Sequence, residues 1–312
     1  MNKGILVIGD IMLDKYVYGA CDRISPEAPI PIINYIKEKN SLGGAANVAN
    51  NVECLGVDAY LIGLLGKDTN ADVLGSLIES NNIKNHTISS SNILTITKTR
   101  ILGNNQQICR IDEESKNHFA SNIESKIEEK LRLLMPKIDI IIISDYDKGI
   151  LSTGTVRKIC EYADKYEVDV LVDPKFLDWS KYNGAKYITP NFKEFSYAVN
   201  KNISNTNADI EKYGKELLNK YKIDNIIVTR AENGISLINS DDIFHVPTNT
   251  KKVYDVTGAG DTVIATIAFC LLKKIDLKTT LDYANKAASI VIKKLGANAI
   301  TIEDLNSFGF NK

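Results

Sequence analysis

Short runs rich in valine and isoleucine alternate with longer helical stretches, and this order restricts the fold more than any other feature of the sequence. The apolar runs are residues 4–9, 59–63, 138–144, 168–173, 186–189 and 224–229. The helical stretches are about 44–55, 70–81, 121–135, 153–166, 191–199 and 207–221. Such alternation produces parallel crossovers, so we expect an α/β fold with a mostly parallel sheet and helices on both faces. In such sheets ligands bind at the carboxyl ends of the strands.

Two segments, residues 30–37 and 87–112, break this alternation. They contain three or four strand patterns, with a hairpin predicted at the sequence GNNQ. We expect one domain, residues 1–312, in which these segments form a small antiparallel sheet that stands off the body as a lid. The alternative is an edge extension of the main sheet. Exposed edges on a lid favour pairing with a second copy, so we also expect a homodimer through the lid.

The composition argues against several classes of protein. Apolar residues make up 44% and charged residues 25%, as in ordinary globular proteins, and the net charge is −1. A nucleic-acid or membrane surface usually carries a clustered excess of basic residues, which the sequence lacks. No apolar run approaches the length of about 20 residues that spans a bilayer, and Asp10 interrupts the first one. We therefore expect a cytoplasmic protein that binds neither nucleic acid nor membranes.

The sequence YDVTGAGDTVIATIA, residues 254–268, places three small residues directly before a carboxylate. Gly258, Ala259 and Gly260 precede Asp261, and the apolar run 263–272 predicts a buried helix that begins at the glycines. Free N–H groups at such a helix start bind anions, commonly phosphate. By itself, the carboxylate could be an ordinary helix cap.

A second glycine pair lies in the segment SLGGAANVANNVECLGVDAYLIGLLGKD, residues 41–68. The backbone at Gly43 and Gly44 can approach a ligand closely, and Asn47 offers a donor and an acceptor to hydroxyl groups. On spacing alone, tight packing of a helix against the sheet explains these glycines equally well.

Together the two segments resemble the two signatures of the ribokinase-like carbohydrate kinases, also called the PfkB family. The first signature is matched by Gly43, Gly44, Asn47, Ala49, Gly56 and Gly66, and the second by Asp255, Thr257, Gly258, Ala259, Gly260 and Asp261. Thr266 departs from the pattern, which usually has Ala or Gly there. The resemblance implies a ribokinase-like fold and an anion hole for the transferred phosphoryl group at residues 258–260. It also implies that Asp261 is the catalytic base that accepts the proton of the attacking sugar hydroxyl.

Two further segments resemble the nucleotide side of this family, and they imply ATP and Mg²⁺ as cofactors. In ITPNFKEF, Asn191 and Glu194 match an Asn-x-x-Glu element that organises Mg²⁺ through its waters. Alone, this spacing is a helix capping box. The segment IIVTRAENGISLI implies places near the phosphates or adenosine for Thr229, Arg230 and Gly234.

The adenine pocket is the least specific part of the resemblance. Its candidates are Asn285, Ala288 and Asn298, and ordinary helix packing explains these residues equally well.

The N-terminal segment VIGDIMLDKYVYGACDRISPEAPIPI narrows the resemblance to the heptose-phosphate kinases of lipopolysaccharide-core precursor synthesis. Residues 97–112, 143–151, 171–175 and 246–264 resemble them too. This implies phosphorylation of D-glycero-D-manno-heptose 7-phosphate at C1. In the common bifunctional form a nucleotidyltransferase domain follows, so a stand-alone kinase and a kinase half both remain open. Alternatives are another sugar kinase of the family, such as a ribokinase or phosphofructokinase, and a non-catalytic sugar- or nucleotide-binding regulator.

The substrate pocket needs groups for the ring hydroxyls and for the 7-phosphate. The resemblance gives the hydroxyls to Asp14 and Asn47, whereas Asp10 is a weaker candidate that could instead cap a strand end. The cationic candidates for the phosphate are Lys175, Lys148, Arg110, Arg100 and Arg23. Each cation taken alone would serve equally well as a solvated surface residue.

Overall fold

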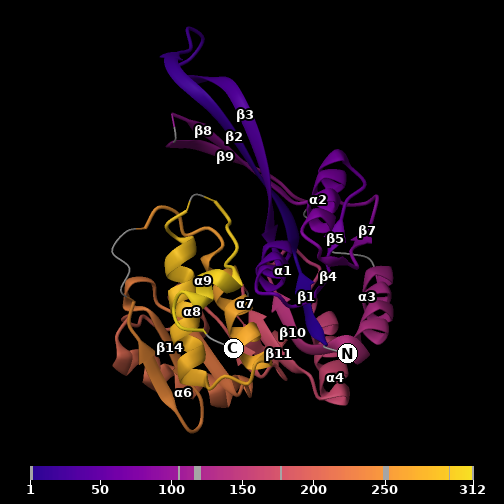
Figure 1. Cartoon of the computed structure of the whole chain (residues 1–312), viewed down its shortest axis with the longest axis vertical. Helices are drawn as coiled ribbons and strands as arrows, with labels where there is room; N and C mark the ends of the chain where they lie inside the picture. Colours follow the sequence, from indigo (N-terminus) through magenta and orange to yellow (C-terminus); the bar gives the residue numbers. More distant parts are fainter. Residues whose placement is uncertain are drawn as a thin grey trace.

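A central sheet of nine strands organises the main body of the protein (Figure 1). The computed structural model describes residues 3–104, 106–115, 121–175, 178–248, 253–294 and 296–310. Asn105 of the predicted hairpin and residues 249–252 of the segment 246–264 lie outside this part of the chain.

The strand order across the sheet is β15-β14-β13-β12-β11-β10-β1-β4-β6. In chain order these strands are β1 (Gly4–Gly9), β4 (Ala59–Ile62), β6 (Lys84–Asn85), β10 (Ile138–Ser144), β11 (Asp169–Asp173), β12 (Tyr187–Ile188), β13 (Asn225–Thr229), β14 (Ile235–Ile238) and β15 (Ile243–Val246). Neighbours from β6 to β13 are parallel, and Val7 of β1 lies opposite both Ile142 of β10 and Leu61 of β4. The strands β14 and β15 add an antiparallel edge. All six predicted apolar runs are strands of this sheet, so the predicted parallel α/β fold is confirmed.

Helices cover both faces of the sheet. They are α1 (Ala45–Cys54), α2 (Thr69–Ser80), α3 (Ser121–Leu134), α4 (Thr153–Tyr166), α5 (Phe192–Val199), α6 (Asn207–Tyr221), α7 (Ala259–Leu272), α8 (Leu277–Val291) and α9 (Ile302–Asn306), with 3₁₀ turns η1 (Met135–Lys137), η2 (Trp179–Tyr182) and η3 (Ala231–Asn233). Alternate residues of β1 enter two cores: Ile5 and Val7 pack with α1, α2, α7 and α8, whereas Leu6 and Ile8 pack with α3 to α6. A strand buried on both faces needs an unbroken apolar sequence, and this explains the run at 4–9.

A second sheet projects from the body with the order β3-β2-β8-β9 (Figure 1). Its strands are β2 (Ile11–Ile24), β3 (Pro31–Gly44), β8 (Thr97–Gly103) and β9 (Gln106–Glu113). The prediction of a separate small sheet is confirmed, and the alternative of an edge extension is wrong. The pairing is mixed rather than wholly antiparallel, because β2 and β8 run parallel. We call these four strands the projecting sheet.

The strand content of the projecting sheet differs from our expectation in two places. The strand β2 was not predicted, since its first residues, Ile11 to Leu13, are buried on both faces and lack the apolar–polar alternation of a half-buried strand. Residues 87–96 do not join this sheet. Instead, β7 (Ile88–Ser89) pairs with β5 (Leu64–Leu65) in a separate two-stranded sheet.

Candidate functional site

The carboxyl ends of the parallel strands meet the N-terminus of α7 at a cleft of about 210 Å³. The cleft is lined by Asp145, Tyr146, Asp173, Pro174, Lys175, Thr189, Asn191, Glu194, Thr229, Val256, Gly258, Gly260 and Asp261. These residues follow β10, β11, β12 and β13 or begin α7. The site thus lies at the edge of the sheet at which parallel α/β folds bind their ligands.

The glycine-rich turn before α7 is held by its own side chains. Asp255 accepts hydrogen bonds from the backbone and hydroxyl of Thr257, and its second oxygen accepts the N–H of Gly296 at 2.8 Å. Gly258 has φ +79°, and a Cβ there would lie 2.9 Å from the amide nitrogen of Asn47. A side chain at this position would therefore be both strained and crowded.

Two backbone amides remain at the start of α7 for an anion. The helix's own ladder begins at Thr262, whose N–H donates to the carbonyl of Gly258 at 3.0 Å. The N–H of Ala259 donates to the carbonyl of Val256 at 3.2 Å and is therefore already engaged within the turn. The N–H groups of Gly260 and Asp261 precede the first hydrogen bond of the helix, so they can donate to a bound anion.

The Asp261 carboxylate is buried between two neutral donors. Its Oδ2 accepts from Nδ2 of Asn47 at 2.7 Å, and its Oδ1 accepts from the hydroxyl of Tyr146 at 2.8 Å. Burial raises the pKa of Asp261 to about 6, against the opposing effect of these two hydrogen bonds. A carboxylate with this pKa is charged at neutral pH and is more basic than an exposed aspartate.

The glycine pair before α1 brings Asn47 to this carboxylate. Gly44 has φ +56°, and a Cβ there would lie 2.4 Å from the carbonyl oxygen of Asp10. A Cβ at Gly43 would lie 2.7 Å from Oδ2 of Asp14. Close packing of α1 against the strands therefore requires these glycines. This is the structural explanation that the sequence offered beside a role in ligand binding.

Asn191 and Glu194 form the capping box at the start of α5. The side chain of Asn191 accepts the N–H of Glu194 at 2.9 Å, and Oε2 of Glu194 accepts the N–H of Asn191 at 3.0 Å. Lys175 donates to the remaining oxygen of Glu194 at 3.2 Å. Within the described chain, no group of three or more His, Cys, Asp or Glu side chains could hold a metal. Mg²⁺ usually keeps several waters and takes phosphate oxygens as ligands, so a carboxylate and an amide oxygen can suffice for it, and the metal role of this pair stays a prediction.

The side chain of Arg230 points into the protein interior and not into the cleft. Its guanidinium is buried and donates to Asn205, Asn207 and Ser236, at distances of 2.7 to 3.0 Å. It fixes the segment before α6, whereas its neighbour Thr229 lines the cleft.

The remaining nucleotide candidates lie on or beside β14, β15 and α8. Gly234 has φ +79°, and a Cβ there would lie 2.0 Å from the carbonyl oxygen of Val246, so the turn itself demands glycine. Asn285 donates to the carbonyl of Pro247 at 2.9 Å, and Asn298 donates to that of Gly296 at 2.6 Å. Ala288 packs against the core. These contacts give each residue a structural role. Binding of the nucleotide by these residues stays a prediction.

The cationic candidates for the substrate lie in three different places. Arg100 pairs with the buried Asp14 at 2.5 Å and lies opposite Arg110 in the β8–β9 register. Arg110 itself pairs with Asp112, and Lys148 pairs with Glu114 just beyond β9. Lys175 lies instead beside Glu194, on the side that we assigned to the nucleotide. Arg23 is exposed at the far end of β2.

Asp10 caps a strand end, which was the alternative to a contact with the sugar hydroxyls. Its Oδ2 accepts the N–H groups of Tyr146 and Lys148, at 2.9 and 3.1 Å, and it therefore holds the loop that follows β10. Burial raises its pKa to about 6.

Tyr146 and Asp173 belong to the site but were not predicted. Asp173 ends β11, and a Cβ on Gly260 would lie 3.9 Å from its Oδ2. Burial raises the pKa of Asp173 well above its ordinary value, and the charges of Glu194 and Asp261 raise it further. Their positions in the sequence could have revealed them, because polar residues at the ends of buried parallel strands meet at one edge of the sheet.

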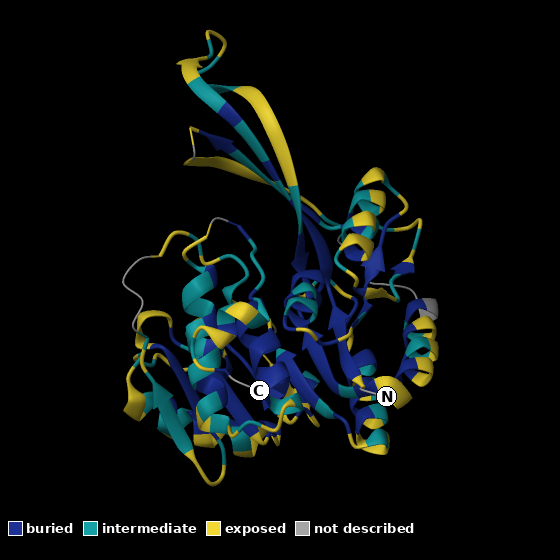
Figure 2. Cartoon of the chain, in the orientation of Figure 1, coloured by how far each residue is buried: buried dark blue, intermediate teal, exposed yellow. Residues whose placement is uncertain are grey.

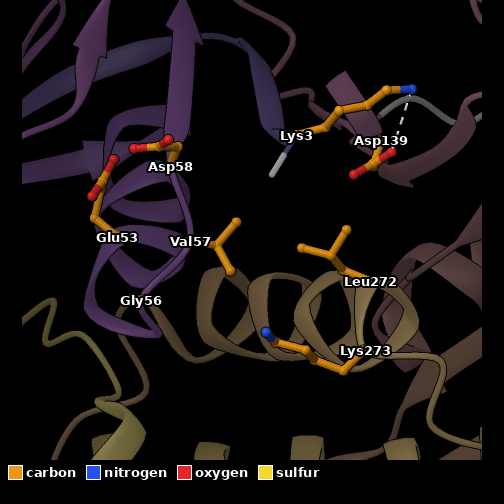
Figure 3. Close-up of a pocket in the computed structure, with 8 residues that line it drawn as sticks. All are labelled: Lys3, Glu53, Gly56, Val57, Asp58, Asp139, Leu272 and Lys273. Carbon is orange, nitrogen blue, oxygen red and sulfur yellow. Dashed lines mark ion pairs between the residues drawn. The ribbon is translucent and has the colours of Figure 1, made fainter. Parts of the chain in front are cut away.

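A second hollow lies at the opposite edge of the sheet (Figure 3). Lys3 precedes β1, Asp58 precedes β4 and Asp139 lies near the start of β10, so these residues mark the amino ends of the strands. Lys3 pairs with Asp139 at 3.6 Å, and Glu53 accepts the N–H of Ala59 at 2.7 Å. The position of this hollow argues against a role in the reaction.

A buried carboxylate beside a helix N-terminus, at the strand ends of a parallel sheet, is an arrangement that suits the transfer of a phosphoryl group to a small molecule. The family model of the pfkB family carbohydrate kinases matches residues 2–304, and the chain belongs to this family. Of the helices that the structure describes, none is both long and apolar enough to cross a membrane.

Relatives with similar sequences are named bifunctional proteins. The bifunctional protein HldE of Aliarcobacter butzleri (strain RM4018) is 41% identical over 308 residues, covering 98% of this chain and 64% of that protein. The one of Helicobacter hepaticus (strain ATCC 51449 / 3B1) is 39% identical over 302 residues, covering 96% and 62%. The chain spans just under two thirds of the length of these curated relatives.

Solved structures with similar folds are sugar kinases. Phosphofructokinase-2 from Escherichia coli in complex with potassium has a TM-score of 0.83 at 19% identity, covering 98% of both chains. Ribokinase from Arabidopsis thaliana complexed with ribose and ATP has a TM-score of 0.78 at 17% identity, covering 100% of both chains. At these identities the likeness shows the fold, and the predicted ribokinase-like fold is confirmed.

The raised pKa of Asp261 predicts a variant that is more stable than the wild type. Because the folded pKa of about 6 exceeds the ordinary value of 3.8, the folded state binds an extra proton between these values, and stability falls as pH rises through them. Asp261→Asn removes this cost. We expect it to raise the free energy of unfolding at pH 8 by up to about 3 kcal/mol, with little gain near pH 4.

Urea denaturation at the two pH values measures this difference. Asp255→Asn is the matched control, because the effect of burial on the pKa of Asp255 is outweighed by hydrogen bonds from Thr257 and Gly296, which lower it. That variant should lose stability at pH 8. A pH-independent effect of Asp261→Asn would contradict the prediction.

Proposed function

We propose that this carbohydrate kinase uses ATP to phosphorylate D-glycero-D-manno-heptose 7-phosphate at the C1 hydroxyl, in the synthesis of ADP-heptose for the lipopolysaccharide core. The observation that carries the chemistry is the Asp261 carboxylate beside the amides of Gly260 and Asp261 itself. The substrate rests on the resemblance of residues 7–32 and four later segments to heptose-phosphate kinases. Identity near 40% to bifunctional HldE proteins over nearly the whole chain supports the same assignment.

The proposed step uses both parts of the α7 N-terminus. Asp261 accepts the proton of the C1 hydroxyl while that oxygen forms a bond to the γ-phosphorus of ATP, and the bond to ADP breaks. The amides of Gly260 and Asp261 stabilise the charge on the transferred phosphoryl oxygens. A pKa of about 6 suits this role, since the carboxylate is ionised at neutral pH but still basic enough to accept the proton.

ATP would bind along the ends of β12 and β13, with Thr229 in the cleft and Gly234, Asn285, Ala288 and Asn298 toward the adenosine. Mg²⁺, when bound near Asn191 and Glu194 through its waters, neutralises charge on the ATP phosphates. Lys175 lies beside Glu194 and would act on the same side.

The sugar would bind under the projecting sheet, which acts as a lid that excludes water. Asp14 and Asn47 would hold the ring hydroxyls, and the bare backbone at Gly43 and Gly44 would allow a close approach. The 7-phosphate would meet a cation near β8 and β9. Arg100 of β8 and Arg110 of β9 lie opposite each other, and Lys148 pairs with Glu114 just beyond β9. Since the chain spans just under two thirds of its curated relatives, this proposal concerns the kinase reaction alone.

Replacement of the proposed base should stop the reaction. We expect Asp261→Asn to lower kcat by roughly 10²–10⁴-fold while ATP binding changes little, because the isosteric amide keeps the turn but accepts no proton. A coupled ADP-release assay and an ATP titration measure the two effects. Activity above about a tenth of the wild-type value would show that Asp261 is not the base.

The substrate assignment predicts strong discrimination among sugars. D-glycero-D-manno-heptose 7-phosphate should exceed fructose 6-phosphate and ribose by several hundredfold in kcat/KM, because each unpaired buried polar group costs about 1–3 kcal/mol. The same assay across these sugars gives the ratios, and phosphorus NMR of the product should show a new anomeric phosphate. Equal use of fructose 6-phosphate, or an ester at another carbon, would reduce the proposal to a sugar kinase of the pfkB family.

The projecting sheet also supports a homodimer. Its outer strands carry exposed apolar side chains, among them Tyr35 and Ile36 on β3 and Ile111 on β9, with exposed fractions of 67%, 63% and 54%. In Figure 2 much of these two strands has the colour of exposed residues. Open strand edges with apolar side chains favour pairing with a second copy.

A charge on this surface should therefore separate the subunits. We expect sedimentation of the wild type at micromolar concentration to give a dimer and Tyr35→Glu to give a monomer. Leu133→Glu is the control, since Leu133 is equally exposed but lies on α3. A monomeric wild type, or a dimer that only Leu133→Glu disrupts, would exclude this interface.

A further inference from the structure

The loop of residues 145–149, after β10, is anchored far more firmly than an ordinary surface connection. The buried Asp10 accepts two of its backbone N–H groups, those of Tyr146 and Lys148. The buried Asp145 accepts the N–H of Asp147 at 2.8 Å and the hydroxyl of Tyr182 at 2.7 Å. Two buried carboxylates therefore hold one short loop, and the ammonium of Lys181, 2.5 Å from Asp145, compensates the burial of that charge.

The backbone of this loop is also unusual. Asp147 has φ +57°, a left-handed conformation that is uncommon for residues other than glycine, and Gly149 has φ +106°. Strain of this kind persists only where the surroundings fix it, and it gathers at functional sites. The result of the anchoring is the position of one side chain, Tyr146, whose hydroxyl reaches Asp261.

Tyr146 and Asn47 contact different oxygens of the same carboxylate. Asn47 donates to Oδ2 and Tyr146 to Oδ1 of Asp261, so together they fix the plane of the carboxylate, whereas one donor alone would leave it free to rotate. A carboxylate accepts about four hydrogen bonds, so each oxygen keeps a place for a substrate hydroxyl. Both donors are neutral, and they therefore orient the carboxylate without the large loss of basicity that a paired cation would cause.

We propose that Tyr146 is a positioning residue for the reaction: its hydroxyl orients the Asp261 carboxylate toward the attacking sugar hydroxyl, and the loop anchored by Asp10 and Asp145 keeps it there. The inference rests on the proposed role of Asp261 as base. Tyr146 remains a donor at any working pH, since burial and the charge of Asp261 raise its pKa well above 10.

The ionisable groups around Asp261 come from several elements. Asp14 of β2 raises the pKa of Asp261 by its charge, and Asp173 of β11 faces Tyr146. The substitution Tyr146→Phe leaves both acids in place and removes one hydrogen bond to the charged form of Asp261. The pKa of Asp261 should then rise.

The experiment is a pH profile of kcat for the wild type and for Tyr146→Phe. We expect the acid limb of the variant to move up by about one pH unit, so that its activity falls about 5-fold at pH 6, about 2-fold at pH 7 and little above pH 8. A uniform loss at every pH, or an unchanged profile, would overturn the proposal.

Two controls separate this role from a structural one. Tyr182→Phe removes a hydroxyl bound to Asp145 of the same loop but not to Asp261, so its acid limb should stay in place. If it moves as far as that of Tyr146→Phe, the loop and not the tyrosine hydroxyl is responsible, and the proposal is wrong. Urea denaturation adds a readout without turnover: Tyr146→Phe should lose more stability at pH 8 than at pH 5, because the bond to charged Asp261 is the stronger one.

Asp261→Asn, measured beside these variants, distinguishes the two levels of the argument. An active Asp261→Asn overturns the proposed base and with it the positioning role. An inactive Asp261→Asn together with an unshifted Tyr146→Phe leaves the kinase proposal intact and overturns only the inference about Tyr146.

Discussion

The site depends on one costly interaction, a carboxylate removed from water at the start of a buried helix. Three segments far apart in sequence meet there, because Asn47 comes from α1, Tyr146 from the loop after β10 and Asp261 from α7. Each donor needs its own support, a glycine pair before α1 and the Asp10 carboxylate under the loop. The buried charge of Asp261 is costly to the fold, and the surrounding structure compensates for it with these two hydrogen bonds.

The sequence predicted the parts of the molecule that follow a regular period or a long motif. The strand β1 reads as an unbroken apolar run because both of its faces are buried, and α7 follows directly from glycines and an apolar stretch. The strand β2 was missed because its base is buried on both faces and its tip is exposed, so no single period runs along it. Tyr146 was missed because no local pattern marks a side chain whose partner lies 115 residues away.

Motif residues are also needed for structure, which limits what a match says about function. Arg230 stands inside a segment that resembles the nucleotide side, yet its guanidinium binds Asn205, Asn207 and Ser236. Asn191 and Glu194 form the capping box that their spacing allows in any helix. Arg230 fixes the position of its neighbour Thr229, which lines the cleft, so its replacement would alter activity without direct contact with a ligand. Asn191 and Glu194 line the cleft themselves, so their replacement would disturb both the helix cap and the cleft.

The way in which the projecting sheet joins the body has a mechanical consequence. Only Asp10 separates the end of β1 from the start of β2, and β3 runs directly into α1 at Gly44 (Figure 1). A joint made of continuing strands has few free torsions, so we expect the projecting sheet to move as one stiff unit and not as a flap on a flexible linker. In such a motion the tip of the sheet would be displaced most, whereas its base, which contains Asp14 and Gly43, would move very little. If the sheet is the proposed lid, its bending would admit the sugar without disturbing the groups proposed to bind it.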